Sequence, residues 1–192
     1  MTVPLSRRAF PAAVAGGLAV AAAAASDDPK APPAEPARDY PAPKFTPQFR
    51  KPQLGKTLVQ DFVIYCHFHD ELEMVKKLLE KEPALLNATQ DWGGGDWESG
   101  LGGASHMGNR AIAEFLLSKG ARIDLFCAAM LGELDVVKGV LIATPTLIDA
   151  KGPHGISLHA HAKAGGKHAE AVLGYLQSIK KVDLTPKPMK KG

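Results

Sequence analysis

The apolar positions in the second half of the chain recur with the spacing of one helix face. In one segment they are Leu72, Val75, Leu78 and Leu79, which stand at positions i, i+3, i+6 and i+7. This spacing places all four side chains on one side of an α-helix. Related patterns recur three times along the chain. They predict amphipathic helices within residues 70–79, 108–117, 132–141 and 166–176.

A shorter helix is predicted before each of these segments, at residues 58–68, 101–107, 125–131 and 158–164. These shorter segments are rich in glycine, alanine and other small residues, which let neighbouring helices stack closely. Pro83, Gly120 and Pro145 mark the ends of the longer helices. Equivalent leucines are separated by 38, 24 and 35 residues: Leu79, Leu117, Leu141 and Leu176. The chain is therefore predicted to repeat a pair of helices.

Three segments resemble the ankyrin repeat. Residues 132–141, Gly-x-Leu-x-Val-Val-Lys-x-x-Leu, resemble its second helix, and residues 116–124 resemble its Leu-Leu-x-x-Gly-Ala-x-Val-Asn ending. Residues 155–159 resemble a shortened opening motif. The resemblance implies an all-α fold, an ankyrin-repeat solenoid of about four irregular helix-turn-helix repeats at residues 57–182. It also implies protein binding through the concave surface of hairpin tips and first helices.

The repeats depart from the ankyrin pattern at their openings. The opening motif is absent from the first repeat, and residues 99–102 replace it in the second. The third repeat has no room for a hairpin, which accounts for the spacing of 24 residues. In the fourth repeat, the resemblance implies that His159 ties one loop to the next. Missing hairpins remove contacts between neighbouring repeats, so we expect modest stability.

The first 25 residues have the pattern of an export signal. Arg7 and Arg8 precede 15 apolar or small residues, fewer than the roughly 20 that span a membrane. Residues 6–10, Ser-Arg-Arg-Ala-Phe, resemble the twin-arginine signal of bacteria. We therefore expect a protein exported to the periplasm or extracellular space of a bacterium, with residues 1–25 removed.

The segments on either side of the repeats are expected to be unfolded. Residues 26–56 are rich in Pro and Ala and predict a disordered linker, and residues 183–192 predict a flexible basic tail. Without Arg7 and Arg8, 21 basic residues face 20 acidic ones. This balance does not favour nucleic acid or a membrane as partner. We expect a monomer that binds another protein.

The candidate binding site is the sequence Asp-Trp-Gly-Gly-Gly-Asp-Trp-Glu at residues 91–98, where a hairpin should join the first two repeats. Glycines permit unusual backbone angles, and tryptophan is a preferred interface anchor. One interpretation is a protruding aromatic finger whose acids meet a basic partner. The other is that one or both tryptophans fold back over the core. His106 is expected at the surface nearby. The candidate contacts are Asp91, Trp92, Asp96, Trp97 and His106.

Histidines offer an alternative function. Two histidine pairs have members that are two residues apart, His67 with His69 and His159 with His161. The two members of such a pair do not share a helix face. His154, His159 and His161 could still converge around a loop. The alternative is therefore a metal- or ligand-linked accessory subunit or enzyme of the cell envelope that uses these three. No nucleophile motif or phosphate loop is present, so the main prediction has no catalytic residue, metal or cofactor.

The two cysteines are predicted to be free and buried. Cys66 and Cys127 fall in the first helices of the first and third repeats, with a whole repeat between them. A disulfide needs Cα atoms within about 7 Å, whereas even adjacent packed helices lie about 10 Å apart.

Overall fold

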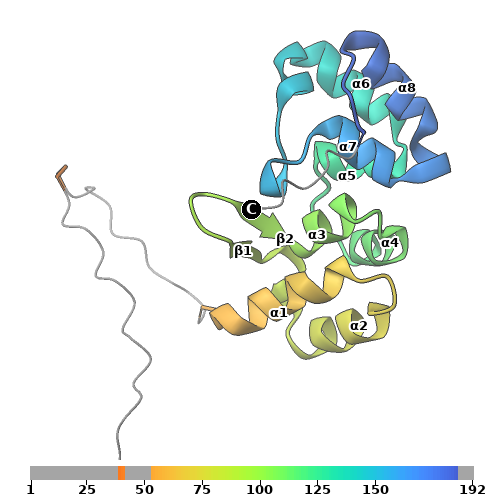
Figure 1. Ribbon diagram of the computed structural model, residues 1–192. Coiled ribbons are helices and arrows are strands. Elements are labelled where there is room, and N and C mark those ends of the chain that lie inside the picture. The colour runs from red at the N-terminus through yellow and green to blue at the C-terminus, as the bar shows by residue number, and fades with distance from the viewer. Residues whose placement is uncertain (1–38, 42–52, 186–192) are drawn as a thin grey trace, which may run out of the picture. The chain divides into compact units, whose positions relative to one another are not determined.

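The computed structural model describes residues 39–41 and 53–185 (Figure 1). The predicted export signal, most of the predicted linker and the end of the predicted basic tail lie outside the described residues. All the described helices and strands belong to one compact unit within residues 48–192. Among the described residues, no helix combines the length and apolar character needed to cross a membrane.

Within the described residues, eight α-helices follow one another in four pairs, and the predicted all-α class is confirmed. Each observed helix overlaps a predicted one, with ends shifted by a few residues at most. The pairs are α1 (Lys56–His67) with α2 (Leu72–Lys81), α3 (Gly100–His106) with α4 (Arg110–Ser118), α5 (Leu125–Leu131) with α6 (Leu134–Ala143), and α7 (Leu158–Ala164) with α8 (Glu170–Ile179).

The first helices of the pairs pack side by side in chain order, α1 on α3, α3 on α5 and α5 on α7. The starts of the last three are set by side-chain caps. Ser99, Asp124 and Ser157 each accept a hydrogen bond from the backbone N–H three residues later. Such caps satisfy a donor that the first turn leaves free. The starts of these three helices thus follow from local signals repeated along the chain.

The connections between pairs differ. The first contains a 3₁₀ helix (Pro83–Asn87) and an antiparallel hairpin of β1 (Thr89–Asp91) and β2 (Trp97–Ser99). The third contains the 3₁₀ helices Pro145–Asp149 and Pro153–Gly155 and an isolated bridge between Lys151 and Ser157. The second has no strand, as predicted. Figure 1 shows the β1–β2 hairpin projecting from one side of the stack.

Small residues in α3 allow its close packing against α1. An added Cβ at Gly100 would lie 2.7 Å from the Phe62 ring, and one at Gly103 would lie 2.5 Å from the His67 ring. Both distances are too short for a real contact. The two glycines therefore fix the separation of α1 and α3, as the small-residue pattern predicts, and Gly103 leaves space for the His67 imidazole.

The prediction of two free, buried thiols is confirmed. Cys66 and Cys127 are both fully buried and unpaired. Burial raises the pKa of Cys66 to about 12 and that of Cys127 to about 11. Both thiols are therefore protonated at neutral pH, and neither has the low pKa of a reactive cysteine.

Candidate functional site

A buried carboxylate, Glu98, lies at the base of the hairpin. Alternate residues of a strand point to opposite faces. In β2, Trp97 points outward and is 58% exposed, whereas Glu98 points inward and its side chain is fully buried. The Trp92 indole donates a 2.8 Å hydrogen bond from Nε1 to Glu98 Oε2. His67 Nε2 lies 3.1 Å from the same oxygen. A charge in the interior is thus held by polar groups from the hairpin and from α1.

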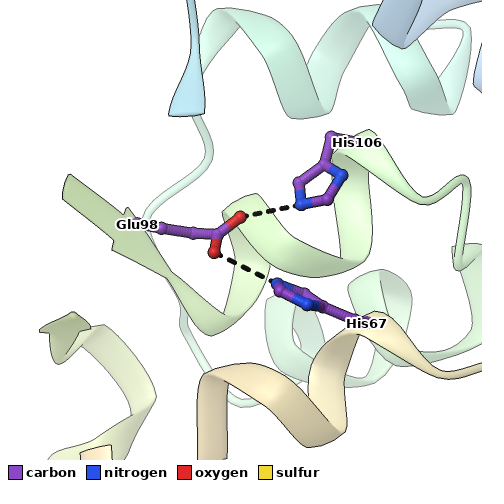
Figure 2. Close-up of side chains that lie close together, drawn as sticks. All are labelled: His67, Glu98 and His106. Carbon is purple, nitrogen blue, oxygen red and sulfur yellow. Dashed lines mark hydrogen bonds and ion pairs between the residues drawn. The ribbon is translucent and has the colours of Figure 1, made fainter. Parts of the chain in front are cut away.

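Two further histidines complete the ring of nitrogen atoms around Glu98. His106 Nε2 lies 2.9 Å from Oε1, and His154 Nε2 lies 3.3 Å from Oε2. Figure 2 shows the carboxylate between the imidazoles of His67 and His106. His67 ends α1, His106 ends α3, and His154 lies in the turn before α7. The site therefore joins segments that are distant in the sequence.

His154 is positioned by Asp96. Its backbone has φ of 58°, in the left-handed region that is costly for residues other than glycine. Asp96 Oδ1 accepts the His154 backbone N–H at 2.9 Å, and Asp96 Oδ2 lies 2.8 Å from His154 Nδ1. These two contacts stabilise the unusual conformation. They also tie the hairpin turn to a loop that is 58 residues away in the sequence.

The hairpin turn has the glycine geometry that the sequence indicates. Gly93, Gly94 and Gly95 have φ values of 106°, 62° and 86°. No heavy atom lies within 4 Å of an added Cβ at any of the three, so backbone conformation rather than crowding requires glycine here. This turn sends the chain back so that Trp92 and Glu98 meet.

Both carboxyl groups of the site are ionised at neutral pH. Burial is the largest single influence on Glu98 and opposes its ionisation. The contacts of His106, His67 and Trp92 together outweigh burial, so the pKa of Glu98 lies well below its usual range. The backbone hydrogen bond from His154 is the main cause of the lowered pKa of Asp96. The site is therefore a fixed pair of negative charges faced by imidazoles.

One pair of atoms in this site is left without a hydrogen bond. Glu98 Oε1 and His106 Nε2 are buried and form an ion-pair contact of 2.9 Å, but neither atom has a hydrogen-bond partner. His67, Glu98 and His106 each offer a ligand atom within 4.8 Å of the others, and no other such trio occurs in the described part of the chain. Imidazole and carboxylate are ligands for divalent transition metals.

The candidate partner contacts fall into two groups. Asp91 and Trp97 are exposed. Trp92 folds back against the core and Asp96 binds His154, so these two side chains are already engaged within the chain. The expectation that His106 lies at the surface is wrong, since its side chain is only 9% exposed. It is drawn inward because it ends α3 directly above Glu98. Trp92 is thus the tryptophan that folds back over the core, and Trp97 is the one that lies exposed on the hairpin.

His154, His159 and His161 are not brought together as a ligand set. His159 Nε2 donates to the Lys180 carbonyl just after α8, and His161 Nδ1 donates to the Ser157 carbonyl. His159 thus contacts the end of its own helix pair rather than a neighbouring hairpin. His154 instead joins Glu98, which lay outside the candidate set, as did His67. The alternation of β2 could have indicated that Glu98 points inward if Trp97 points outward.

A groove of about 360 Å³ runs beside the exposed Trp97. Its walls come from the hairpin, the starts of α3 and α5, and the loop before α7. They combine apolar and charged side chains, among them Trp97, Phe126, Pro153, Asp124 and Lys151. The groove is therefore suited to an extended segment that carries both apolar and polar groups.

Comparison with protein-family models, with curated proteins and with solved structures finds no match for this chain. The resemblance to the ankyrin repeat therefore stays a prediction from the sequence.

Proposed function

We propose that this chain is an exported, non-catalytic ankyrin-type repeat protein that binds another protein, as a monomer, through its hairpin side. The observation that carries the proposal is the 58% exposure of Trp97 on a hairpin that is tied down at its base. Large aromatic side chains on rigid supports are frequent anchors of protein interfaces. The stacking of four helix pairs supports the ankyrin-type architecture.

The hairpin is held in place before any partner arrives. Trp92 is bonded to Glu98, and Asp96 is bonded to His154, on either side of the glycine turn. Ordering a flexible loop costs free energy during association. Because β2 is already fixed, Trp97 can bind with little further ordering.

The groove beside Trp97 indicates the chemistry of the partner. Phe126 and Pro153 offer apolar contacts, while Asp124 and Lys151 offer one charge of each sign. An extended peptide segment with an apolar side chain between polar ones fits this surface. A strongly basic partner is less well matched, because Asp96 and Glu98 already face histidines.

Site-specific photo-crosslinking tests this proposal. A photoreactive phenylalanine analogue replaces Trp97 in one variant and Ile142 in another. Ile142 is 76% exposed on α6, away from the lining of the groove, and serves as the matched control. We expect an extract of the source cells to give one defined crosslinked protein at position 97 and none at position 142. Identical products at both positions would contradict binding by the hairpin side.

Export is tested separately. The proposal rests on Arg7 and Arg8 and on the apolar residues 11–25. Replacing both arginines by lysine keeps the charge but removes the guanidinium groups. We expect this change to retain the protein in the cytoplasm if the twin-arginine route is used. Continued export would point to a general secretory signal, and retention of the unaltered chain would contradict export.

A further inference from the structure

We propose that His67, Glu98, His106 and His154 bind one divalent transition-metal ion of the zinc class. This site is separate from the groove that holds a protein partner in the proposed function. Its ligand atoms are the Nε2 atoms of the three histidines and the carboxylate oxygens of Glu98.

The first argument is the placement of the histidine nitrogens. His154 Nδ1 lies 2.8 Å from Asp96 Oδ2, and its Nε2 lies 3.3 Å from Glu98 Oε2. His67 and His106 also direct their Nε2 atoms at the Glu98 carboxylate, at 3.1 Å and 2.9 Å. A histidine that binds a metal usually has its other ring nitrogen in contact with a carboxylate or carbonyl, and His154 has this arrangement with Asp96.

The second argument is the unpaired contact of His106. Its Nε2 and Glu98 Oε1 are buried, 2.9 Å apart and without a hydrogen bond. Buried polar atoms without partners are rare and costly. Binding of both atoms to one cation would satisfy them together. The Trp92 indole already orients the carboxylate through Oε2, which is the role of an outer partner in a metal site.

The donor set selects the class of ion. Three imidazole nitrogens and one carboxylate suit zinc and its neighbours in the first transition row. Calcium and magnesium prefer sets made of oxygen atoms.

Metal binding would stabilise the fold as well as fill the site. The ligands come from the end of α1, from β2, from the end of α3 and from the loop before α7. One ion would therefore link the hairpin to three of the helix pairs. Because an unfolded chain does not hold these ligands together, binding free energy would be added to folding.

The test uses the full chain stripped with a chelator and titrated with zinc chloride near neutral pH. Calorimetry gives the affinity, elemental analysis gives zinc per chain, and thermal unfolding is measured with and without zinc. The variants are His106→Gln, His154→Gln and Asp96→Asn. The control carries His69→Gln and His168→Gln, which replace two exposed histidines that do not face Glu98.

We expect one zinc per chain, a higher Tm with zinc, and no change in the control. Loss of an outer partner typically weakens metal binding 10–100-fold, so Asp96→Asn should fall in that range. His106→Gln and His154→Gln should each weaken binding by more than about 100-fold, because they remove direct ligands.

Two results would overturn the proposal. One is no zinc binding by the unaltered chain, which would mean that protons on the imidazoles balance Glu98. The other is zinc affinity that is unchanged in both His106→Gln and His154→Gln. Circular dichroism checks that each variant is folded. If His106→Gln unfolds, His154→Gln decides, because that side chain is 35% exposed and its loss leaves the core packed. The visible spectrum of bound Co²⁺ then reports whether His154 is a ligand.

Discussion

Two groups of histidines in this molecule differ in what faces them. Around Glu98, three imidazoles from different segments meet one buried charge. In α7, His159 and His161 are fully buried, and each donates to a backbone carbonyl. The rings of His161 and Phe126 lie 4.9 Å apart. His159 and His161 therefore have the surroundings of core residues.

The difference shows that burial of a histidine does not by itself make a site. His161 is buried among apolar groups, and burial lowers its pKa, so it stays neutral and acts as a single hydrogen-bond donor. Around Glu98 the interior holds a charge that requires partners. The convergence of several segments on that charge distinguishes a binding site from a packed helix.

The largest expected effect is that of Glu98→Gln in metal-free protein. The amide keeps the shape but removes the charge that Trp92 and His67 contact. Hydrogen bonds to charged groups contribute more than neutral ones, so we expect the free energy of unfolding to fall by about 2–3 kcal/mol. Urea denaturation measures the change. The control is Glu114→Gln, an exposed partner of Arg110 on α4, whose loss should cost about 0.5 kcal/mol or less. Equal effects of the two variants would mean that the buried Glu98 charge contributes no more to stability than the exposed Glu114 charge.

The same carboxylate should determine the response to acid. The pKa of Glu98 in the folded chain is lowered from its ordinary value of 4.5. Below pH 4.5 the unfolded chain therefore binds a proton that folded Glu98 does not, and stability falls as the pH falls. The free energy of unfolding, measured from pH 5 downward, should decline more steeply for the unaltered chain than for Glu98→Gln. Parallel curves of unfolding free energy against pH for the two proteins would contradict a lowered pKa of Glu98.

The contrast between fold and site also explains what could be predicted from the sequence. The helices follow local signals, namely apolar spacing and the caps at Ser99, Asp124 and Ser157, so their positions were predicted closely. The site depends on contacts between distant segments. His67 reaches Glu98 across 31 residues only because Gly103 lets α1 and α3 approach.

The conformation of His154 could not be predicted from the sequence either. A left-handed backbone is uncommon at a histidine, and here it depends on two contacts with Asp96. No periodic pattern indicates such a contact. For this reason the prediction from the sequence places His154 in one site with His159 and His161, which are its neighbours in the chain. It does not place His154 with His67 and His106.

Gly103→Ala should show whether the position of the His67 ring matters for stability and for zinc binding. Its Cβ would lie 2.5 Å from the His67 ring, so the ring must shift from its position beside Glu98. Overpacking of this kind costs about 1–2 kcal/mol, and zinc affinity should fall with it. Gly139→Ala is the matched control, because nothing lies within 4 Å of its added Cβ in α6. That change should stabilise the helix slightly. Unaltered zinc binding in Gly103→Ala would mean that the site does not depend on the observed position of the His67 ring.

The smallest expected effect is that of His161→Leu. The leucine gives up one hydrogen bond to Ser157 O but also removes Nε2, which is buried without a partner. The two changes nearly offset each other, so we expect a change in stability within about 1 kcal/mol at pH 7. His106→Leu should cost more, because it removes the 2.9 Å ion-pair contact with the buried Glu98 Oε1.

The pH dependence of His161→Leu sharpens the comparison further. The pKa of His161 in the folded chain is lowered from 6.5. Below pH 6.5, His161 of the unfolded chain therefore binds a proton that folded His161 does not bind. Stability from this residue is therefore lost as the pH falls from 7 to 5. The difference between the unaltered chain and His161→Leu, measured by urea denaturation across this range, isolates that contribution from the other histidines. A pH slope that is unchanged in His161→Leu would contradict a lowered pKa of His161.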